Sequence, residues 1–365
     1  KELAKKLGAC LVGIASIDRF KNAPPIHPPT ALLPGAKAVI VVATFWADAS
    51  IELTEKEISE HWYNPSDVTE RFGGMGHKLH FIPFILSKFL EEKGYDSFPF
   101  PQTGYWRWRP YKSMQDAFAP PLVHRYAAVA AGLGEIGWHT SFLSPQFGPR
   151  QRLCSIATEA PLKPDPLYDG EPLCDKCMNC VKACPYERFT KEVEKIVELD
   201  IGGKKIRIPR TNKWRCHLCY YEVNPRFLPK RITEEVAIRI ENDPRVPKKF
   251  IMDSAACICA CLPPKLRKKD ENLYPHTIAR KREKKQVDYN ECTEKIKEMV
   301  KDGFMDFLFI GTKEEFNKKG IKLDDYMPYS ASVIFFGKRY ENEFMKEASF
   351  LKTILLGYEM QNLLQ

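Results

Sequence analysis

The stretch LCDKCMNCVKACP, residues 173–185, most constrains what this chain can fold into, because it places four cysteines within eleven positions and ends in a proline. This spacing is that of bacterial ferredoxins, in which the first three thiolates bind one [4Fe–4S] cluster and the fourth binds another. Zinc is the main alternative, but four-cysteine zinc sites use two separate CxxC pairs. The motif therefore predicts an iron–sulfur module with two clusters.

A second and less regular set of cysteines follows the motif. Two four-thiolate clusters need eight thiolates, and the motif supplies four of them. The second set offers five candidates for the other four: Cys216, Cys219, Cys257, Cys259 and Cys261. Because Cys257 and Cys261 keep the CxxxC step of a ferredoxin repeat, we predict that Cys261 completes the first cluster. The predicted ligands are Cys174, Cys177, Cys180 and Cys261 for the first cluster and Cys184, Cys216, Cys219 and Cys257 for the second. Cys259 is then the spare thiol, although the sequence leaves open which of Cys216, Cys219 and Cys259 is not a ligand.

Length and cysteine usage place the chain outside the class of small disulfide-rich secreted proteins. It has 365 residues, and nine of its twelve cysteines lie in the two clusters. No apolar run reaches the length of a membrane span, and the run at 38–45 has the length of a buried strand. We therefore expect a cytoplasmic protein with no membrane span.

The segment just upstream of the cysteine motif is rich in glycine. Residues 124–162 predict an alanine-rich helix, a turn punctuated by glycines, and a strand at 152–157. Glycine permits left-handed backbone and close approach to a flat ligand. The GLGEIG string is only a weak match to a nucleotide-binding loop, and it follows a helix rather than a strand, which excludes the Rossmann interpretation.

The order AAGLGEIG, SPQFGPRQRL and CDKCMNCVKACP closely resembles the reductive dehalogenase and epoxyqueuosine reductase superfamily. The resemblance covers roughly residues 3–263 and is strongest at 131–185. It implies a corrinoid in a nitroreductase-like α/β domain, supplied with electrons by two [4Fe–4S] clusters in an adjacent ferredoxin-like module. The corrinoid-lining candidates that it implies are Gly132, Gly134, Gly137, His139, Gly148 and Arg150.

The chain departs from this superfamily at the position of a catalytic acid. Epoxyqueuosine reductases resembling this chain carry a V-D-S-A-P segment before the glycines, and here Phe118 takes the place of its aspartate. Our candidate proton donors are Tyr105, in the aromatic and arginine-rich string at 103–112, and Tyr126. The tRNA-binding repeat tail of that family is also absent from the sequence, which makes tRNA an unlikely partner.

Scaffold elements flank these motifs. Apolar runs at 9–15 and 37–45 predict buried strands. Residues 77–92 predict an amphipathic helix with Phe81, Phe84, Ile85 and Phe89 on one face. Residues 303–311 and 327–340 are similar to residues 8–15 and 33–46, which predicts a partial repeat, with coincidence between generic strand pairs as the alternative. Residues 265–286 hold nine Lys and Arg against three Asp and Glu, typical of a solvated basic linker or a docking patch.

The predicted fold class is α/β (α+β), with a nitroreductase-like corrinoid-binding domain, an inserted or adjacent ferredoxin-like two-cluster module, and a partial repeat of the N-terminal domain. The predicted domains are 1–165 (nitroreductase-like), 166–264 (ferredoxin-like), 265–288 (basic linker) and 289–365 (partial repeat). The predicted function is an iron–sulfur oxidoreductase that passes low-potential electrons through two [4Fe–4S] clusters to a corrinoid, cobalamin. The alternative is a non-catalytic electron-transfer or assembly subunit that has lost the corrinoid.

The expected partners follow from this function. They are a low-potential electron donor of the ferredoxin or flavodoxin type and a small-molecule substrate whose identity the sequence does not specify. A homo-oligomer or a tandem copy would complete the partial repeat at the C-terminal end.

Overall fold

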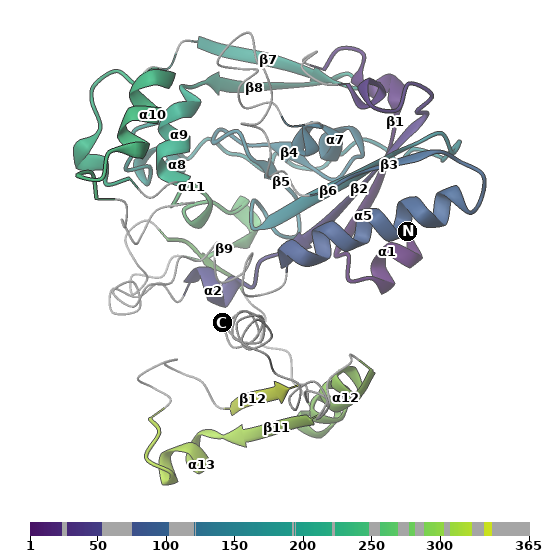
Figure 1. Ribbon diagram of the computed structural model, residues 1–365, viewed down its shortest axis with the longest axis vertical. Coiled ribbons are helices and arrows are strands. Elements are labelled where there is room, and N and C mark those ends of the chain that lie inside the picture. The colour runs from purple at the N-terminus through teal and green to yellow at the C-terminus, as the bar shows by residue number, and fades with distance from the viewer. Residues whose placement is uncertain are drawn as a thin grey trace, which may run out of the picture. The chain divides into compact units, whose positions relative to one another are not determined.

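A computed structural model describes residues 1–23, 28–52, 75–101, 120, 122–191, 193, 195–220, 223–247, 256–268, 277–281, 288–302, 307–322 and 332–337. The chain divides into two units, residues 1–281 and residues 282–365, which are described separately (Figure 1). Among the helices within the described residues, none combines the length and the hydropathy that a membrane-spanning segment needs.

The first unit is built on a four-stranded antiparallel sheet with the strand order β1–β2–β6–β3. Its strands are β1 (Leu11–Ser16), β2 (Ala38–Phe45), β3 (Ser97–Phe100) and β6 (Gln151–Thr158). The strands predicted at 9–15, 37–45 and 152–157 are thereby confirmed. Strand β2 is buried at every position but the last, which explains why all of its residues except Thr44 are apolar: both of its faces are covered.

Helices cover the two faces of this sheet. Successive side chains of a strand point to opposite faces, so Val39 and Val41 pack with α7 (His124–Ala130), whereas Ile40 and Val42 pack with α5 (Met75–Glu91). Figure 1 shows α5 running along the sheet on its own side. The mixed α/β character of the predicted fold is confirmed.

Helix α5 packs through a different face from the predicted one. Its buried side chains are Leu79, Ile82, Leu86 and Leu90, while its three phenylalanines, Phe81, Phe84 and Phe89, are exposed. The helix contains two apolar stripes, and the aliphatic one fits the sheet. The apolar face predicted from the phenylalanines is therefore the exposed one, and the helix packs through its aliphatic face.

The cysteine-bearing part of the chain follows β6. It contains α8 (Asn179–Lys182), the hairpin β7 (Lys195–Ile201) and β8 (Lys204–Arg210), α9 (Lys213–Tyr220), α10 (Glu234–Asn242) and α11 (Ala256–Cys259). Leu199 and Ile208 of the hairpin join the same hydrophobic core as α7. The hairpin therefore ties the cysteine-bearing segments to the glycine-rich region, and the domain boundary at residue 165 stays a prediction.

Short elements complete the first unit. They are α1 (Glu2–Lys6), α2 (Asp48–Glu52), β4 (Glu135–Ile136), β5 (Phe142–Leu143), β9 (Arg267–Lys268), β10 (Ala279–Arg280) and 3-10 turns at 17–20, 29–31, 225–227 and 264–266. Strands β4 and β5 form a small hairpin, and its turn lies beside the cysteines.

The second unit contains α12 (Tyr289–Asp302), β11 (Phe307–Thr312), α13 (Lys313–Lys318) and β12 (Ser332–Gly337). Strands β11 and β12 pair antiparallel with Ile310 opposite Ile334, just as Ile14 lies opposite Ile40 between β1 and β2. Thr312 caps the helix after β11, and Ser16 caps the 3-10 turn after β1. This shared order is what a repeat would produce, and the repeat stays a prediction.

Candidate functional site

None of the twelve cysteines forms a disulfide bond. Cys174, Cys177, Cys180 and Cys261 lie near one another: burial raises the pKa of Cys261, and the other three thiols raise it further. Burial likewise raises the pKa of Cys180 to about 12, with added contributions from Cys174 and Cys177. The structure thus gathers the four residues that the sequence assigned to the first cluster.

The backbone of the cysteine loop explains how closely spaced thiols converge. Lys176 and Met178 have φ values of 55° and 62°, a left-handed conformation that non-glycine residues adopt rarely. These two reversals fold the loop around Cys177, and Cys180 follows in α8. Cys261 arrives from the segment just after α11.

The turn between β4 and β5 supplies N–H donors to this first group. The Trp138 N–H donates to Cys174 Sγ at 3.4 Å, and His139 Nε2 lies 3.3 Å from Cys261 Sγ. The Ser141 N–H donates to His139 Nδ1, so the ring proton sits on Nε2 and points toward the sulfur. Burial and then the nearby Arg188 lower the pKa of His139 to about 4, so the ring is a neutral donor at neutral pH.

A second group of thiols lies beside the first. Burial, Cys184 and Cys216 raise the pKa of Cys257, and Cys180 of the first group also contributes. Cys219 follows Cys216 on α9 and packs in the same apolar cluster as Cys184. Both Cys257 and the remaining thiol of this set, Cys259, pack against the cluster beneath the main sheet, and the Cys259 carbonyl accepts the Ile278 N–H.

The described thiols are spread more widely than the ligands of a single metal ion. Within the described residues, no three Cys, His, Asp or Glu side chains approach closely enough to hold one metal ion. Thiolates that each bind a different iron of a cubane lie farther apart than the ligands of one ion. N–H groups aimed at the sulfurs, as at Cys174, Cys216 and Cys261, are a known means of tuning such clusters.

The predicted corrinoid-lining glycines face protein atoms. A Cβ on Gly132 would lie 1.8 Å from the Pro166 carbonyl oxygen, and a Cβ on Gly134 would lie 2.0 Å from that of Leu143. The Cβ positions of Gly137 and Gly148 would meet side-chain atoms of Leu143, at 2.9 Å, and of Pro263, at 2.7 Å. In this structure each glycine therefore makes room for a neighbouring segment of the chain.

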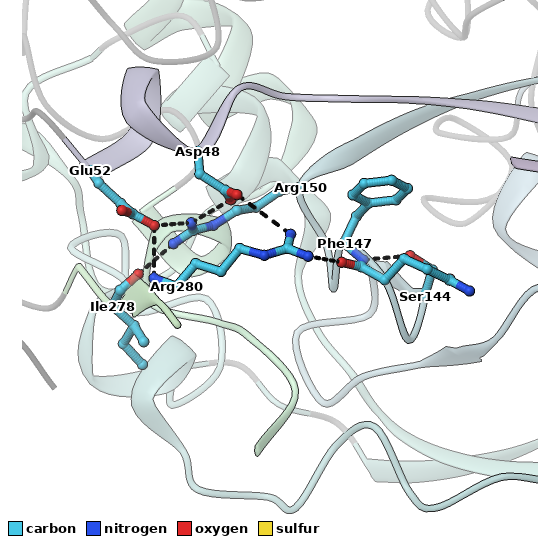
Figure 2. A network of polar contacts seen from close by, with 8 residues as sticks. Asp48, Glu52, Ser144, Phe147, Arg150, Ile278 and Arg280 are labelled. Atoms are coloured by element: carbon cyan, nitrogen blue, oxygen red, sulfur yellow. Dashed lines mark hydrogen bonds and ion pairs between the residues drawn. The ribbon is translucent and has the colours of Figure 1, made fainter. Parts of the chain in front are cut away.

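Arg150 is fully buried in an ion-pair network (Figure 2). Its Nη1 donates to Asp48 at 2.9 Å and to Glu52 at 2.6 Å, and its Nη2 donates to the Ile278 carbonyl. Arg280 joins the network through its backbone N–H to Glu52 and its guanidinium to Asp48. Arg150 thus connects the start of α2 with the segment after Cys261.

Of the two candidate proton donors, Tyr105 lies outside the described residues. Tyr126 borders a cavity of about 400 Å³ and is half-buried. The cavity is lined by Ile17, Asp18, Phe20, Lys21, Ala23, Pro28, Pro29, Thr30, Leu122, Val123 and Tyr126. The lining is mostly apolar and also contains the Tyr126 phenol, Thr30 and the ion pair of Asp18 with Lys21. Such a cavity can hold a small organic molecule.

Arg188 is the residue of this site that the sequence did not single out. Its Nη1 donates to Cys216 Sγ at 3.5 Å, its Nη2 donates to Thr140 Oγ1 at 2.9 Å, and its Nε donates to Thr211 Oγ1 at 2.9 Å. The only signal in the sequence is its place four residues after Cys184.

No protein-family model matches the chain. The tetrachloroethene reductive dehalogenase of Desulfitobacterium hafniense is 33% identical over 89 residues, which are 24% of this chain and 16% of that protein. The epoxyqueuosine reductase of Synechococcus sp. (strain CC9605) is 37% identical over 67 residues, 18% of this chain and 20% of that protein. The chain therefore matches only about a fifth or less of the length of these relatives.

Among solved structures, the catabolic reductive dehalogenase NpRdhA gives a TM-score of 0.42 at 18% identity, over 70% of this chain and 34% of that one. The two sequence matches exceed 30% identity and name the two enzyme groups that the motif order indicated. The resemblance is confirmed: this chain has its homologues in the reductive dehalogenase and epoxyqueuosine reductase superfamily.

Proposed function

We propose that the protein is an oxidoreductase that passes low-potential electrons through two [4Fe–4S] clusters to a corrinoid, which reduces a small-molecule substrate. The observation that carries the proposal is the pairing of the two cysteine sets. Cys261 lies with the first three cysteines of the motif, and Cys184 lies with Cys216 and Cys257. This crosswise pairing is the one that two-cluster ferredoxins use.

The ligands proposed for the first cluster are Cys174, Cys177, Cys180 and Cys261, and those for the second are Cys184, Cys216, Cys219 and Cys257. Thiolates are the binding form, and burial raises the pKa of Cys180, Cys184, Cys257 and Cys261. Cluster assembly must therefore release protons. The clusters, once bound, would supply one-electron transfer, and their close spacing would let an electron pass from one group to the other.

The residues of the chain have distinct roles in this proposal. The turn at 138–140 aims N–H groups at the sulfurs of the first group. It also holds Arg188 through the Thr140 hydroxyl, and Arg188 donates to a sulfur of the second group. Tyr126 would provide a proton at the cavity, where a phenol can protonate a reduced substrate. The glycines that the sequence assigned to the corrinoid face protein atoms, so they are not proposed as its support. Cobalamin, when bound, would supply the reducing metal centre, and the cavity lining would exclude water around the substrate.

The test is a visible spectrum of the anaerobically purified protein followed by equilibrium dialysis against cobalamin. We expect the broad absorption of iron–sulfur clusters and saturable cobalamin binding. If the protein contains the clusters but binds no cobalamin, the hypothesis of an electron-transfer subunit would replace that of an enzyme. The absence of both would refute the proposal.

A further inference from the structure

The turn between β4 and β5 contacts both groups of thiols. Trp138 and His139 point N–H groups at Cys174 and Cys261 of the first group. The next residue, Thr140, accepts a hydrogen bond from Arg188, which in turn donates to Cys216 of the second group. Thr140 has a φ of 67°, rare for a β-branched residue, and such strained backbone tends to persist at functional sites.

Arg188 brings a permanent positive charge to the second group. Within the described residues its hydrogen-bond partners are two threonine hydroxyls and the Cys216 thiol, and its guanidinium lies 5.1 Å from the centre of the Phe189 ring. The two hydroxyls and the ring are neutral, so the sulfur of Cys216, which binds iron as a thiolate, is the one of these partners that carries negative charge. The side chain is half-buried, so water screens its charge only in part.

The cation near the first group of thiols is paired with a carboxylate. Arg267 lies near Cys177 and Cys261, but it makes two hydrogen bonds of 2.7 Å to the two carboxylate oxygens of Asp175. The charge of Arg267 is therefore balanced by a carboxylate, whereas that of Arg188 has no carboxylate among its described hydrogen-bond partners. The two groups of thiols thus sit in different electrostatic surroundings.

We propose that Arg188, oriented by Thr140 and Thr211, raises the reduction potential of the cluster held by the Cys184 group. Reduction adds one electron and no bond is made or broken, so a fixed positive charge stabilises the product more than the reactant. The electron comes from a low-potential one-electron carrier. This inference rests on the proposed function, because it requires a cluster in each group.

The consequence concerns the entry of electrons. Cys216 is exposed, so the second group is the one that an external donor can approach from the side of α9. A higher potential at this cluster favours capture of the electron at the entry side. Arg188 is a positioning and tuning residue, since it reaches the cluster only through a ligand sulfur.

The experiment is a redox titration of the anaerobic full-length protein, followed by electron paramagnetic resonance at chemically fixed potentials with dithionite as reductant. Arg188→Gln is expected to lower one midpoint potential by the equivalent of at least a tenfold change in the equilibrium, about 59 mV for one electron. The other potential is expected to move less. Arg188→Lys keeps the charge and should restore most of the difference.

A matched control removes a cation and its counter-charge together. The double variant Arg267→Gln with Asp175→Asn changes the net charge near the first group by zero, so both potentials should move less than in Arg188→Gln. Equal shifts in the control and in Arg188→Gln would overturn the inference, because they would show that the potentials do not follow net charge.

The outcomes separate the two proposals. Two clusters with unchanged potentials in Arg188→Gln would overturn the inference and leave the proposed function standing. Wild-type protein without iron would refute the proposed function and, with it, the inference. If Arg188→Gln loses the second cluster, Thr211→Val, which removes the acceptor of Nε, should lower the same potential by a smaller amount. An unchanged potential in that variant would count against the role of Arg188.

Discussion

Substituting Gly132 by alanine tests whether the glycines of the turn accommodate protein or ligand. Gly132 has a φ of 75°, and its added Cβ would meet the Pro166 carbonyl oxygen at 1.8 Å. Gly203 is the matched control, since it has a φ of 90° and nothing within 4 Å of its Cβ position. Alanine at Gly203 should cost about 1 kcal/mol of folding free energy, the penalty for left-handed backbone.

At Gly132 the same penalty applies, and the overlap with a backbone oxygen adds about 1–3 kcal/mol. The total of about 2–4 kcal/mol corresponds to a fall in the thermal midpoint of roughly 4–16 °C, against roughly 2–4 °C for Gly203→Ala. The assay is far-ultraviolet circular dichroism of anaerobic, cobalamin-free protein at one scan rate. Equal midpoints for the two variants would refute the reasoning, because they would mean that only a bound ligand needs the glycine at 132.

Three further predictions concern individual side chains. Cys257→Ser should reduce the iron content from about eight to about four atoms per chain, whereas Cys259→Ser should retain all of the iron, as measured by a colorimetric iron assay. The opposite result would make Cys259 the ligand and Cys257 the spare thiol. Burial lowers the pKa of His124 from 6.5 to about 4. The unfolded chain therefore binds the proton first, and stability falls by about 3 kcal/mol as the pH drops through this window. His124→Gln should show a weaker pH dependence of the thermal midpoint over the same window, and an unchanged profile would argue against this. Arg150→Met leaves the two carboxylates of its network without their central cation, so the unfolding free energy should fall by about 3–5 kcal/mol, and a thermal midpoint equal to wild type would contradict that.

The sequence predicted the elements that depend on local patterns. Strand β2 follows from a run of β-branched and apolar residues, and the structure places it at Ala38–Phe45. The prediction that Cys261 belongs with Cys174 rested on spacing, and these thiols do lie together. The strand follows from its own residues, whereas the grouping of Cys174 with Cys261 follows from two cysteine spacings that resemble the two halves of a ferredoxin repeat.

Features that depend on distant partners could not be predicted in this way. Glycine at 132 indicates left-handed backbone, but only the fold shows that Pro166 fills the space in front of it. Helix α5 carries two apolar stripes, and the sheet selects the aliphatic one over Phe81 and Phe84. Arg188 reaches Thr140, which lies 48 residues away in the chain, so no local pattern marks it.

The central claim is that the eight grouped thiols hold two iron–sulfur clusters, and metal analysis of the anaerobically purified protein tests it most directly. We expect about eight irons and about eight acid-labile sulfides per chain. Zinc in place of iron, or about four irons in fully loaded wild-type protein, would contradict it.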